Sequence, residues 1–440
     1  MKGILLLLFL TLLTVTCHAS PLPSQSSLVN SSRVGPGCYR RSNETSSVEC
    51  FIRTLNHDNF PDLISKQELS SVRALRIKCS DKFLFDSFLA PNQTLFQMTF
   101  LEEVSVESCK IRSLPSNVWA SLSYLRKLRI SSRNGDWSTS VSLLVDNQAF
   151  QGLNQLTSLD LSQNNIWSLP ETIFCPLRSL QKLNVSWNRL SELEELNPGL
   201  PEANFCSLNG VTVVDASFNQ LRRVGRIVKW KKLVELQLEN NFIEELQDDA
   251  FAELGSLRSV NLSSNRLVAL PPSIFKFNGG SLREVYLANN SISALAPAVF
   301  SGLNGLLLLD VSRNTLTSQW IREKMFNGLV RLLALRLSFN QLSSIDEMIF
   351  SDLINLQTLN LDHNRIESVH PGAFRMTANL RVLDLSHNRL VRLDEKVFGG
   401  LGVLRQLYLD HNKIRSVEDR LLENCTNLQV KPFLFTIFCG

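Results

Sequence analysis

Three histidines stand at equivalent positions of the chain, and their spacing makes them the first candidates for chemistry. His363, His387 and His411 are 24 residues apart, and Asp362 and Asp410 precede two of them. An imidazole can bind a transition metal or change its charge near neutral pH. If the fold stacks equivalent positions, these rings could sense endosomal pH or bind a metal. Histidine is also an ordinary residue at an exposed turn, and on that interpretation we predict no metal site and no cofactor.

A basic cluster is the second candidate. It consists of Arg222, Arg223, Arg226, Lys229, Lys231 and Lys232, with Trp230 inside it. Such a cluster can bind an acidic polysaccharide or an acidic protein surface. The next segment carries the acids Glu239, Glu244, Glu245, Asp248, Asp249 and Glu253, and partial neutralisation by them favours a solvated face. A net charge of +4 on 440 residues does not indicate a nucleic-acid binder.

Catalysis is not indicated by any motif. The sequence has no GxSxG, no HExxH and no phosphate-binding loop. Its acidic residues are distributed over positions that the pattern described next predicts to be exposed. We therefore predict that the protein is not an enzyme.

The candidate residues belong to a recurring frame, LxxLxLxxNxI, which is clearest in residues 356–366, LQTLNLDHNRI. Its asparagine recurs at Asn164, Asn188, Asn219, Asn241, Asn265, Asn290, Asn314, Asn340, Asn364, Asn388 and Asn412. A period of about 20 to 29 residues with this signature is typical of leucine-rich repeats. One repeat cannot bury its own leucines, so repeats must stack. We predict a leucine-rich-repeat solenoid of the α/β class, a horseshoe with a parallel concave sheet and an irregular or short-helical convex side.

The frame also assigns the direction of each side chain. Alternation along a strand buries Leu359 and Leu361 and leaves Asn360 and Asp362 outside. The asparagine at the following turn can donate to and accept from backbone groups of adjacent turns. A second apolar signal predicts a buried aromatic column on the convex side, formed by Phe174, Phe251, Phe275, Phe300, Phe326, Phe350, Phe374 and Phe398.

The ends of the chain differ from the repeats. Residues 1–19 have the charge, apolar run and small-residue cleavage site of a secretory signal peptide. We expect a cysteine-containing N-terminal cap over 20–71, about 14 repeats over 72–429, and an aberrant C-terminal tail over 430–440. No stretch is apolar for long enough to span a bilayer, so the chain as given is expected to be secreted.

Eight cysteines remain after removal of the signal peptide, an even number that suits an oxidising compartment. Their positions suggest the pairs Cys38 with Cys50, Cys79 with Cys109, and Cys175 with Cys206. Equivalent positions in adjacent repeats lie about 5 Å apart, which suits a bridge. The apolar tail could fold over the last repeat, with Cys439 bridging Cys425, or it could make that end aggregate. Free thiols or a zinc site are the alternative, and the absence of a CxxC pair disfavours them.

Glycosylation sequons also indicate export. N-x-S/T begins at Asn30, Asn43, Asn92, Asn184, Asn261, Asn289 and Asn424. Asn184 and Asn261 occupy outward strand positions, so sugars there would stand on the concave face. A protein partner is then expected at a flank or at the far end of the arc. Lengthened segments at 125–156 and 191–207 are contact candidates or tolerated surface insertions.

The sequence resembles the extracellular part of arthropod Toll receptors over nearly all of residues 38–429. The similar segments are CSD at 79–81, SCKI at 108–111, DWS at 136–138, NNIWSLPETIFCPL at 164–177 and LREVYLANNSISALAPAVFSGL at 282–303. Among these, DWS and the segment around Cys175 lie outside the repeat consensus.

The resemblance implies an innate immune or developmental receptor that binds a Spätzle-type cystine-knot cytokine or another receptor ectodomain. A full receptor would lie in the plasma membrane. This chain departs from that plan because it has no membrane span, no cysteine-rich C-terminal cap and no signalling domain. We expect a truncated form, able at most to capture ligand as a soluble decoy. The alternative is a secreted matrix or adhesion protein that binds glycans. Loss of heparin retention on substitution of Arg222, Arg223 and Arg226 would favour it.

Overall fold

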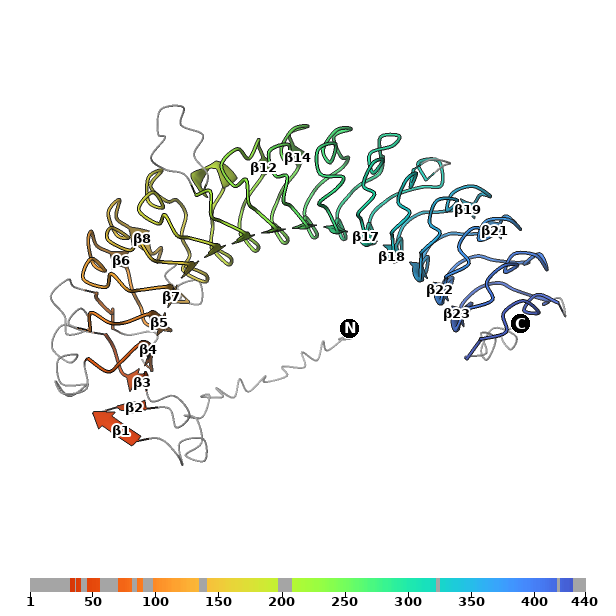
Figure 1. Ribbon diagram of the computed structural model, residues 1–440. Coiled ribbons are helices and arrows are strands. Elements are labelled where there is room, and N and C mark those ends of the chain that lie inside the picture. Colours follow the sequence, from red (N-terminus) through yellow and green to blue (C-terminus); the bar gives the residue numbers. More distant parts are fainter. Residues whose placement is uncertain are drawn as a thin grey trace, which may run out of the picture.

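Short strands with one buried face line the inner side of an arc (Figure 1). In β20 (Thr358–Asn360), Leu359 is fully buried. Thr358 and Asn360 are half-buried on the concave face of the sheet, which faces solvent. The same pattern recurs in the neighbouring strands because each repeat supplies a leucine or valine at the central position. Stacking these apolar positions joins the repeats into one continuous core.

The computed structural model describes residues 32–35, 37–40, 46–55, 70–80, 85–89, 98–133, 141–196, 208–321, 325–417 and 420–429. Among these residues, 17 strands form the inner sheet. The first two pairings, β1 with β2 and β2 with β3, are antiparallel, and each later strand pairs in parallel with the next. The strands are β1 (Ser32–Gly35), β2 (Cys38–Arg40), β3 (Ser47–Ile52), β4 (Ala74–Cys79), β5 (Glu103–Glu107), β7 (Lys127–Ser131), β9 (Ser158–Asp160), β10 (Lys182–Asn184), β11 (Val213–Asp215), β13 (Glu235–Gln237), β15 (Ser259–Asn261), β16 (Glu284–Tyr286), β17 (Leu308–Asp310), β18 (Ala334–Arg336), β20, β22 (Val382–Asp384) and β23 (Gln406–Tyr408).

The outer side of the arc is built mainly from turns. Within the described ranges it carries three two-stranded parallel sheets and one 3₁₀ helix, η4 (Leu193–Leu196). The paired strands are β6 (Ser113–Leu114) with β8 (Leu144–Val145), β12 (Arg223–Val224) with β14 (Glu245–Leu246), and β19 (Ser344–Ile345) with β21 (Ser368–Val369). The predicted horseshoe with a parallel concave sheet is confirmed.

Stacked phenylalanines fill the space between the sheet and the outer turns. All eight phenylalanines of the predicted column are at most 2% exposed. Phe326, Phe350, Phe374 and Phe398 form a continuous stack with ring centroids 6.1 to 6.5 Å apart. Phe150 also belongs to the column and stacks on Phe174. The column makes the outer side of each repeat thick and apolar.

The asparagine of every repeat connects its own turn to the preceding one. Asn364 donates from Nδ2 to the carbonyls of Leu361 and Leu337, both at 3.0 Å, and its Oδ1 accepts from the backbone N–H of Leu342 at 3.1 Å. The same three bonds recur at all eleven positions from Asn164 to Asn412. These amides satisfy buried backbone groups that no strand partner reaches.

Two disulfides link the first turns of the solenoid. Cys38 is bonded to Cys50 across the β2–β3 pair, and Cys79 is bonded to Cys109. Cys175 also forms a disulfide. The proposed partner of Cys175, Cys206, lies outside the described residues, as does Cys439. Cys425 differs from expectation because its thiol is free and buried, so the suggested bridge to Cys439 is not formed.

Several sequence predictions fall on residues that the structure does not describe. They concern the signal peptide, Asn30, Asn43, Asn92, the DWS segment, most of the insertion at 191–207 and the tail over 430–440. Among the residues that are described, no helix has both the length and the apolar character required to cross a membrane.

Candidate protein-binding surface

The N-terminal part of the concave face carries a shallow, charged hollow of about 380 Å³. It is lined by outward side chains of β3, β4, β5, β7 and β9, among them Glu49, Arg76, Glu103, Arg129 and Asp160. Charges of both signs alternate across these strands, and Arg129 lies 3.4 Å from Asp160 in an ion pair. The arginine of this pair is exposed and the aspartate is half-buried, so the pair is largely solvated and weak. An incoming protein could exchange this pair for its own charges at small cost.

Strand ends on the concave face share one capping arrangement. Asp160, Asp215, Asp310 and Asp384 each accept a hydrogen bond at Oδ1 from the backbone N–H of a serine two residues later. Asn184 and Asn261 occupy the same position and make the same bond to Ser186 and Ser263. The cap uses Oδ1 and does not use Nδ2, the atom that carries an N-linked sugar. The two concave sequons therefore lie on β10 and β15, in the middle of the arc.

The other described sequons lie off this face. Asn289 follows β16 at the edge of the sheet, with its Nδ2 donating to Ser264 Oγ at 3.1 Å, and Asn424 is exposed near the C-terminal end. The concave face before β10 holds no sequon among the described residues. The hollow therefore lies on a part of this face that is free of sequons.

A row of stacked side chains follows the edge of the sheet where the strands end. Each residue that precedes a repeat asparagine has a left-handed backbone, with φ between 50° and 62° from Gln163 to His411. This shared conformation aims the side chains in one direction. Phe339, His363, His387 and His411 stack face to face with centroids 4.0 to 4.1 Å apart. Arg313 lies over Phe339 at 4.2 Å and extends the row. We call these five residues the edge row.

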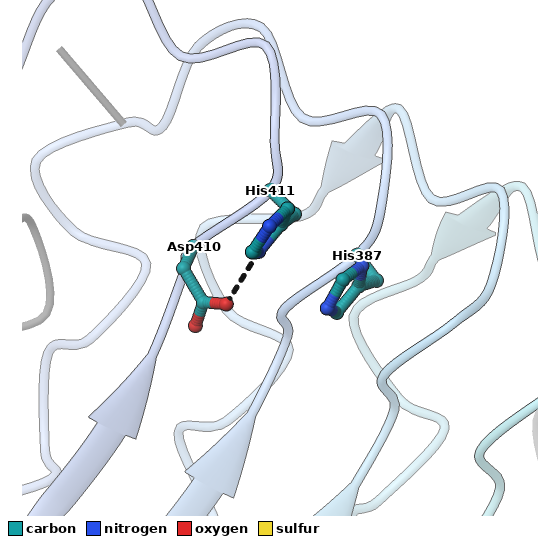
Figure 2. A group of neighbouring side chains, drawn as sticks. All are labelled: His387, Asp410 and His411. Atoms are coloured by element: carbon teal, nitrogen blue, oxygen red, sulfur yellow. Dashed lines mark hydrogen bonds and ion pairs between the residues drawn. The ribbon is translucent and has the colours of Figure 1, made fainter. Parts of the chain in front are cut away.

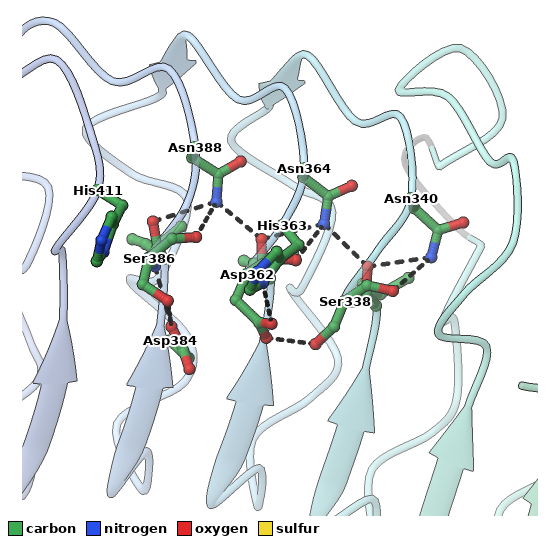
Figure 3. A network of polar contacts seen from close by, with 12 residues as sticks. Ser338, Asn340, Asp362, His363, Asn364, Asp384, Ser386, Asn388 and His411 are labelled. Carbon is green, nitrogen blue, oxygen red and sulfur yellow. Dashed lines mark hydrogen bonds and ion pairs between the residues drawn. The ribbon is translucent and has the colours of Figure 1, made fainter. Parts of the chain in front are cut away.

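Carboxylates stand beside the histidines of the edge row (Figure 3). His363 Nδ1 is 2.9 Å from Asp362 Oδ2, and His411 Nδ1 is 2.7 Å from Asp410 Oδ2. Ser338 donates to Asp362 from the adjacent repeat. Burial, and the neighbouring charges of Asp362 and Asp410, raise the pKa of Asp384 above the ordinary aspartate value, against the lowering effect of its bonds to Ser386. The carboxylates of Asp362, Asp384 and Asp410 therefore repel one another across adjacent repeats.

The basic cluster is partly neutralised by the fold. Arg223 pairs with Glu192 at 3.0 Å, and Arg226 pairs with Glu253 at 2.8 Å. Trp230 is fully buried in the core and cannot stack on a sugar. Lys232 instead lies on a flank, in a hollow of about 670 Å³ that Arg126 and Arg178 also line. Two cations of the cluster are therefore paired with acids, and a third, Lys232, lies in the flank hollow.

Comparison with protein families agrees with the geometry. The leucine-rich-repeat model matches residues 143–190, 230–277, 280–342, 331–390, 354–414 and 378–430. The chain belongs to the leucine-rich repeat family, whose members are protein-interaction modules, and it is not an enzyme.

Relatives include Toll-like receptors and other leucine-rich-repeat proteins. Toll-like receptor 7 of Drosophila melanogaster is 37% identical over 256 residues, which cover 56% of this chain and 17% of that receptor. Toll-like receptor 9 of Equus caballus is 31% identical over 208 residues, 44% of this chain and 20% of that receptor. Osteomodulin of Rattus norvegicus is 26% identical over 260 residues, 55% of this chain and 51% of that protein. The chain thus spans a fraction of the length of each of these relatives.

Solved structures show the same fold at low sequence identity. Toll in the glycosylated Toll–Spätzle complex of Drosophila superposes with a TM-score of 0.63 and 20% identity over 89% of this chain and 61% of that chain. A leucine-rich-repeat protein of Leptospira interrogans gives 0.62 and 21% identity over 86% of this chain and 92% of that chain. These similarities establish the solenoid and nothing further.

Proposed function

We propose that this chain is the ligand-binding, N-terminal part of a Toll-type receptor ectodomain of the arthropod kind, and that it acts outside the cell by binding a protein. The support is the resemblance over the segments around Cys79, Cys109 and Cys175, together with the 37% identity to Drosophila Toll-like receptor 7. The ligand we propose is a Spätzle-type cystine-knot dimer, the partner named in the solved complex of a structural relative. Another receptor ectodomain is the second possible partner.

The charged hollow on β3 to β9 carries the proposal for where the ligand contacts this chain. It has alternating charges, a largely solvated ion pair between Arg129 and Asp160, and no sequon among the described residues before β10. The middle of the concave face, by contrast, carries the sequons at Asn184 and Asn261. Sugars there would exclude a protein from β10 to β15 and direct it towards the N-terminal end of the arc, where the hollow lies.

A sugar placed in the hollow tests this contact. Because Asp160 occupies the capping position, Asp160→Asn creates the sequon N-L-S while it retains an Oδ1 acceptor for the N–H of Ser162. We expect the glycosylated variant, secreted from insect cells, to bind a Spätzle-type dimer at least about tenfold more weakly in biolayer interferometry, a loss of about 1.4 kcal/mol.

Asp215→Asn is the matched control, since it creates N-A-S at the same capping position of β11, beside the existing sequon of β10. Its binding should change less than about twofold. Equal losses in both variants would contradict the assigned contact. If the parent chain binds no such dimer but binds a second ectodomain, the proposed ligand is wrong. The proposed class of receptor would then still stand.

A matrix-binding function is the second candidate, and the flank hollow lined by Arg126, Arg178 and Lys232 favours it. The other side chains that line the flank hollow are uncharged, so no acid among them neutralises its three cations. The hollow therefore suits a sulfated polysaccharide better than Arg223 and Arg226, which are paired with acids. On a heparin column, Arg126→Ser/Arg178→Ser/Lys232→Ser should elute at clearly lower salt than the parent chain. Arg222→Ser/Arg223→Ser/Arg226→Ser should elute close to the parent. The reverse order of elution would assign heparin retention to the basic cluster.

A further inference from the structure

Two histidines and one aspartate at the C-terminal end of the edge row come close enough to share a ligand. The metal-binding atoms of His387, Asp410 and His411 all lie within 4.8 Å of one another. The two rings are 4.0 Å apart and nearly parallel, with 9° between their planes. Figure 2 shows that both rings direct a nitrogen to the side on which the Asp410 carboxylate lies. Two adjacent repeats thus contribute to one group of donors.

The fold holds this arrangement in advance. His387 and His411 have the left-handed backbone, with φ of 50° and 55°, so both side chains leave the chain in the same direction. The buried asparagines Asn388 and Asn412, which follow them, tie each turn to its neighbour through backbone carbonyls. The donors therefore stand on a rigid frame, and only side-chain rotation separates them from a closed site.

The donor set selects the kind of ion. Imidazole nitrogen with one carboxylate suits Zn²⁺, which takes three such protein ligands and keeps a fourth position for water. Calcium and magnesium prefer sites made of oxygen alone. A tetrahedral zinc ion with bonds of about 2.0 to 2.2 Å holds its ligand atoms roughly 3.3 Å apart. Contraction of the cluster by about 1.5 Å, through rotation of the half-buried His387 and Asp410 and the exposed His411, meets that requirement.

We propose that His387, Asp410 and His411 form a zinc site that joins two adjacent repeats. His411 Nδ1 now lies in hydrogen-bond contact with Asp410. On zinc binding, the neutral ring holds its proton on Nε2, and the lone pair of Nδ1 and the carboxylate both turn to the ion. The sequence alone favoured ordinary turn histidines; the proximity of the three donors in the structure is what changes that interpretation. The proposal does not depend on the receptor function.

Zinc titration of the secreted chain tests the site directly, provided that the purification tag contains no histidine. The probe is zinc chloride in a buffer without chelating components, followed by isothermal titration calorimetry. We expect one zinc ion per chain with a Kd of about 10⁻⁶ M. His387→Asn and His411→Asn should each weaken binding at least about tenfold. Asparagine is the suitable replacement because Asn240 and Asn289 occupy the same left-handed position in this chain.

His363→Asn is the matched control, since His363 stacks in the same row but does not belong to the group of three. It should change zinc affinity less than about twofold. Cobalt substitution adds a second measurement, because a tetrahedral Co²⁺ site with nitrogen and oxygen ligands absorbs visible light. Circular dichroism melting without metal checks that every variant is folded. Binding weaker than about 1 mM, or equal losses in all three histidine variants, would overturn the site.

Discussion

Replacing Phe350 with alanine is expected to lower the free energy of unfolding by about 4 kcal/mol, the largest effect of any single change considered for this protein. Phe350 is fully buried and stacks on Phe326 and Phe374, one ring on each side. Removing its ring exposes both neighbours to a cavity that the rigid turns cannot close. Urea unfolding of the disulfide-intact chain, followed by circular dichroism, measures the change.

Phe277→Ala is the control for Phe350→Ala because Phe277 belongs to the same residue type but is 60% exposed. Its effect should remain within about 0.5 kcal/mol. A loss at Phe350 no greater than the loss at Phe277 would mean that the column does not stabilise the solenoid.

Asn364→Ala is expected to cost about 3 kcal/mol, the second largest effect. The side chain is 8% exposed and makes four hydrogen bonds to backbone groups of two repeats. Alanine would remove one of two asparagine donors from the carbonyls of Leu337 and Leu361, which keep Asn340 and Asn388, and it would leave the buried N–H of Leu342 without its acceptor. Each lost hydrogen bond costs about 1 kcal/mol. Hydrogen exchange should also show faster opening at Leu342, whose N–H donates to Asn364.

Asn360 offers a control in the same repeat. It lies in β20 on the concave face of the sheet, and its side chain makes no hydrogen bond within the described part of the structure. Asn360→Ala should change stability by less than about 0.5 kcal/mol. If the two alanine variants unfold at the same urea concentration, the hydrogen bonds of the repeat asparagines do not stabilise the solenoid.

The pattern of residue types within a single repeat of the sequence was sufficient to predict most of the fold. Alternation of leucines identifies the buried strand face, and the recurrent asparagine identifies the turn, because both follow from the chemistry of one repeat. The phenylalanine column could be predicted for the same reason, since stacking repeats in register places equivalent residues in contact. Phe150 was missed because its repeat, lengthened by an insertion, departs from the regular spacing.

The surface was harder to predict, because it depends on how repeats are rotated against one another. Trp230 lies among basic residues in the sequence, yet its side chain enters the core. The bridge suggested for Cys425 is not formed, and nothing in the repeat pattern indicated this. The edge row was recognised only in its three histidines. Arg313 and Phe339 belong to it because the left-handed turn aligns unlike side chains, and residue identity gave no sign of that.

The two stacks also differ in spacing, and this difference gives the solenoid its shape. Rings of the buried column are 6.1 to 6.5 Å apart, whereas rings of the edge row are 4.0 to 4.1 Å apart. Each repeat is thus a wedge, about 2 Å thicker at the column than at the edge row. A rigid ligand that spans several wedges is complementary to a single radius of curvature. On the proposed contact, the volume of side chains that never touch the ligand therefore helps to set which ligands fit the concave face.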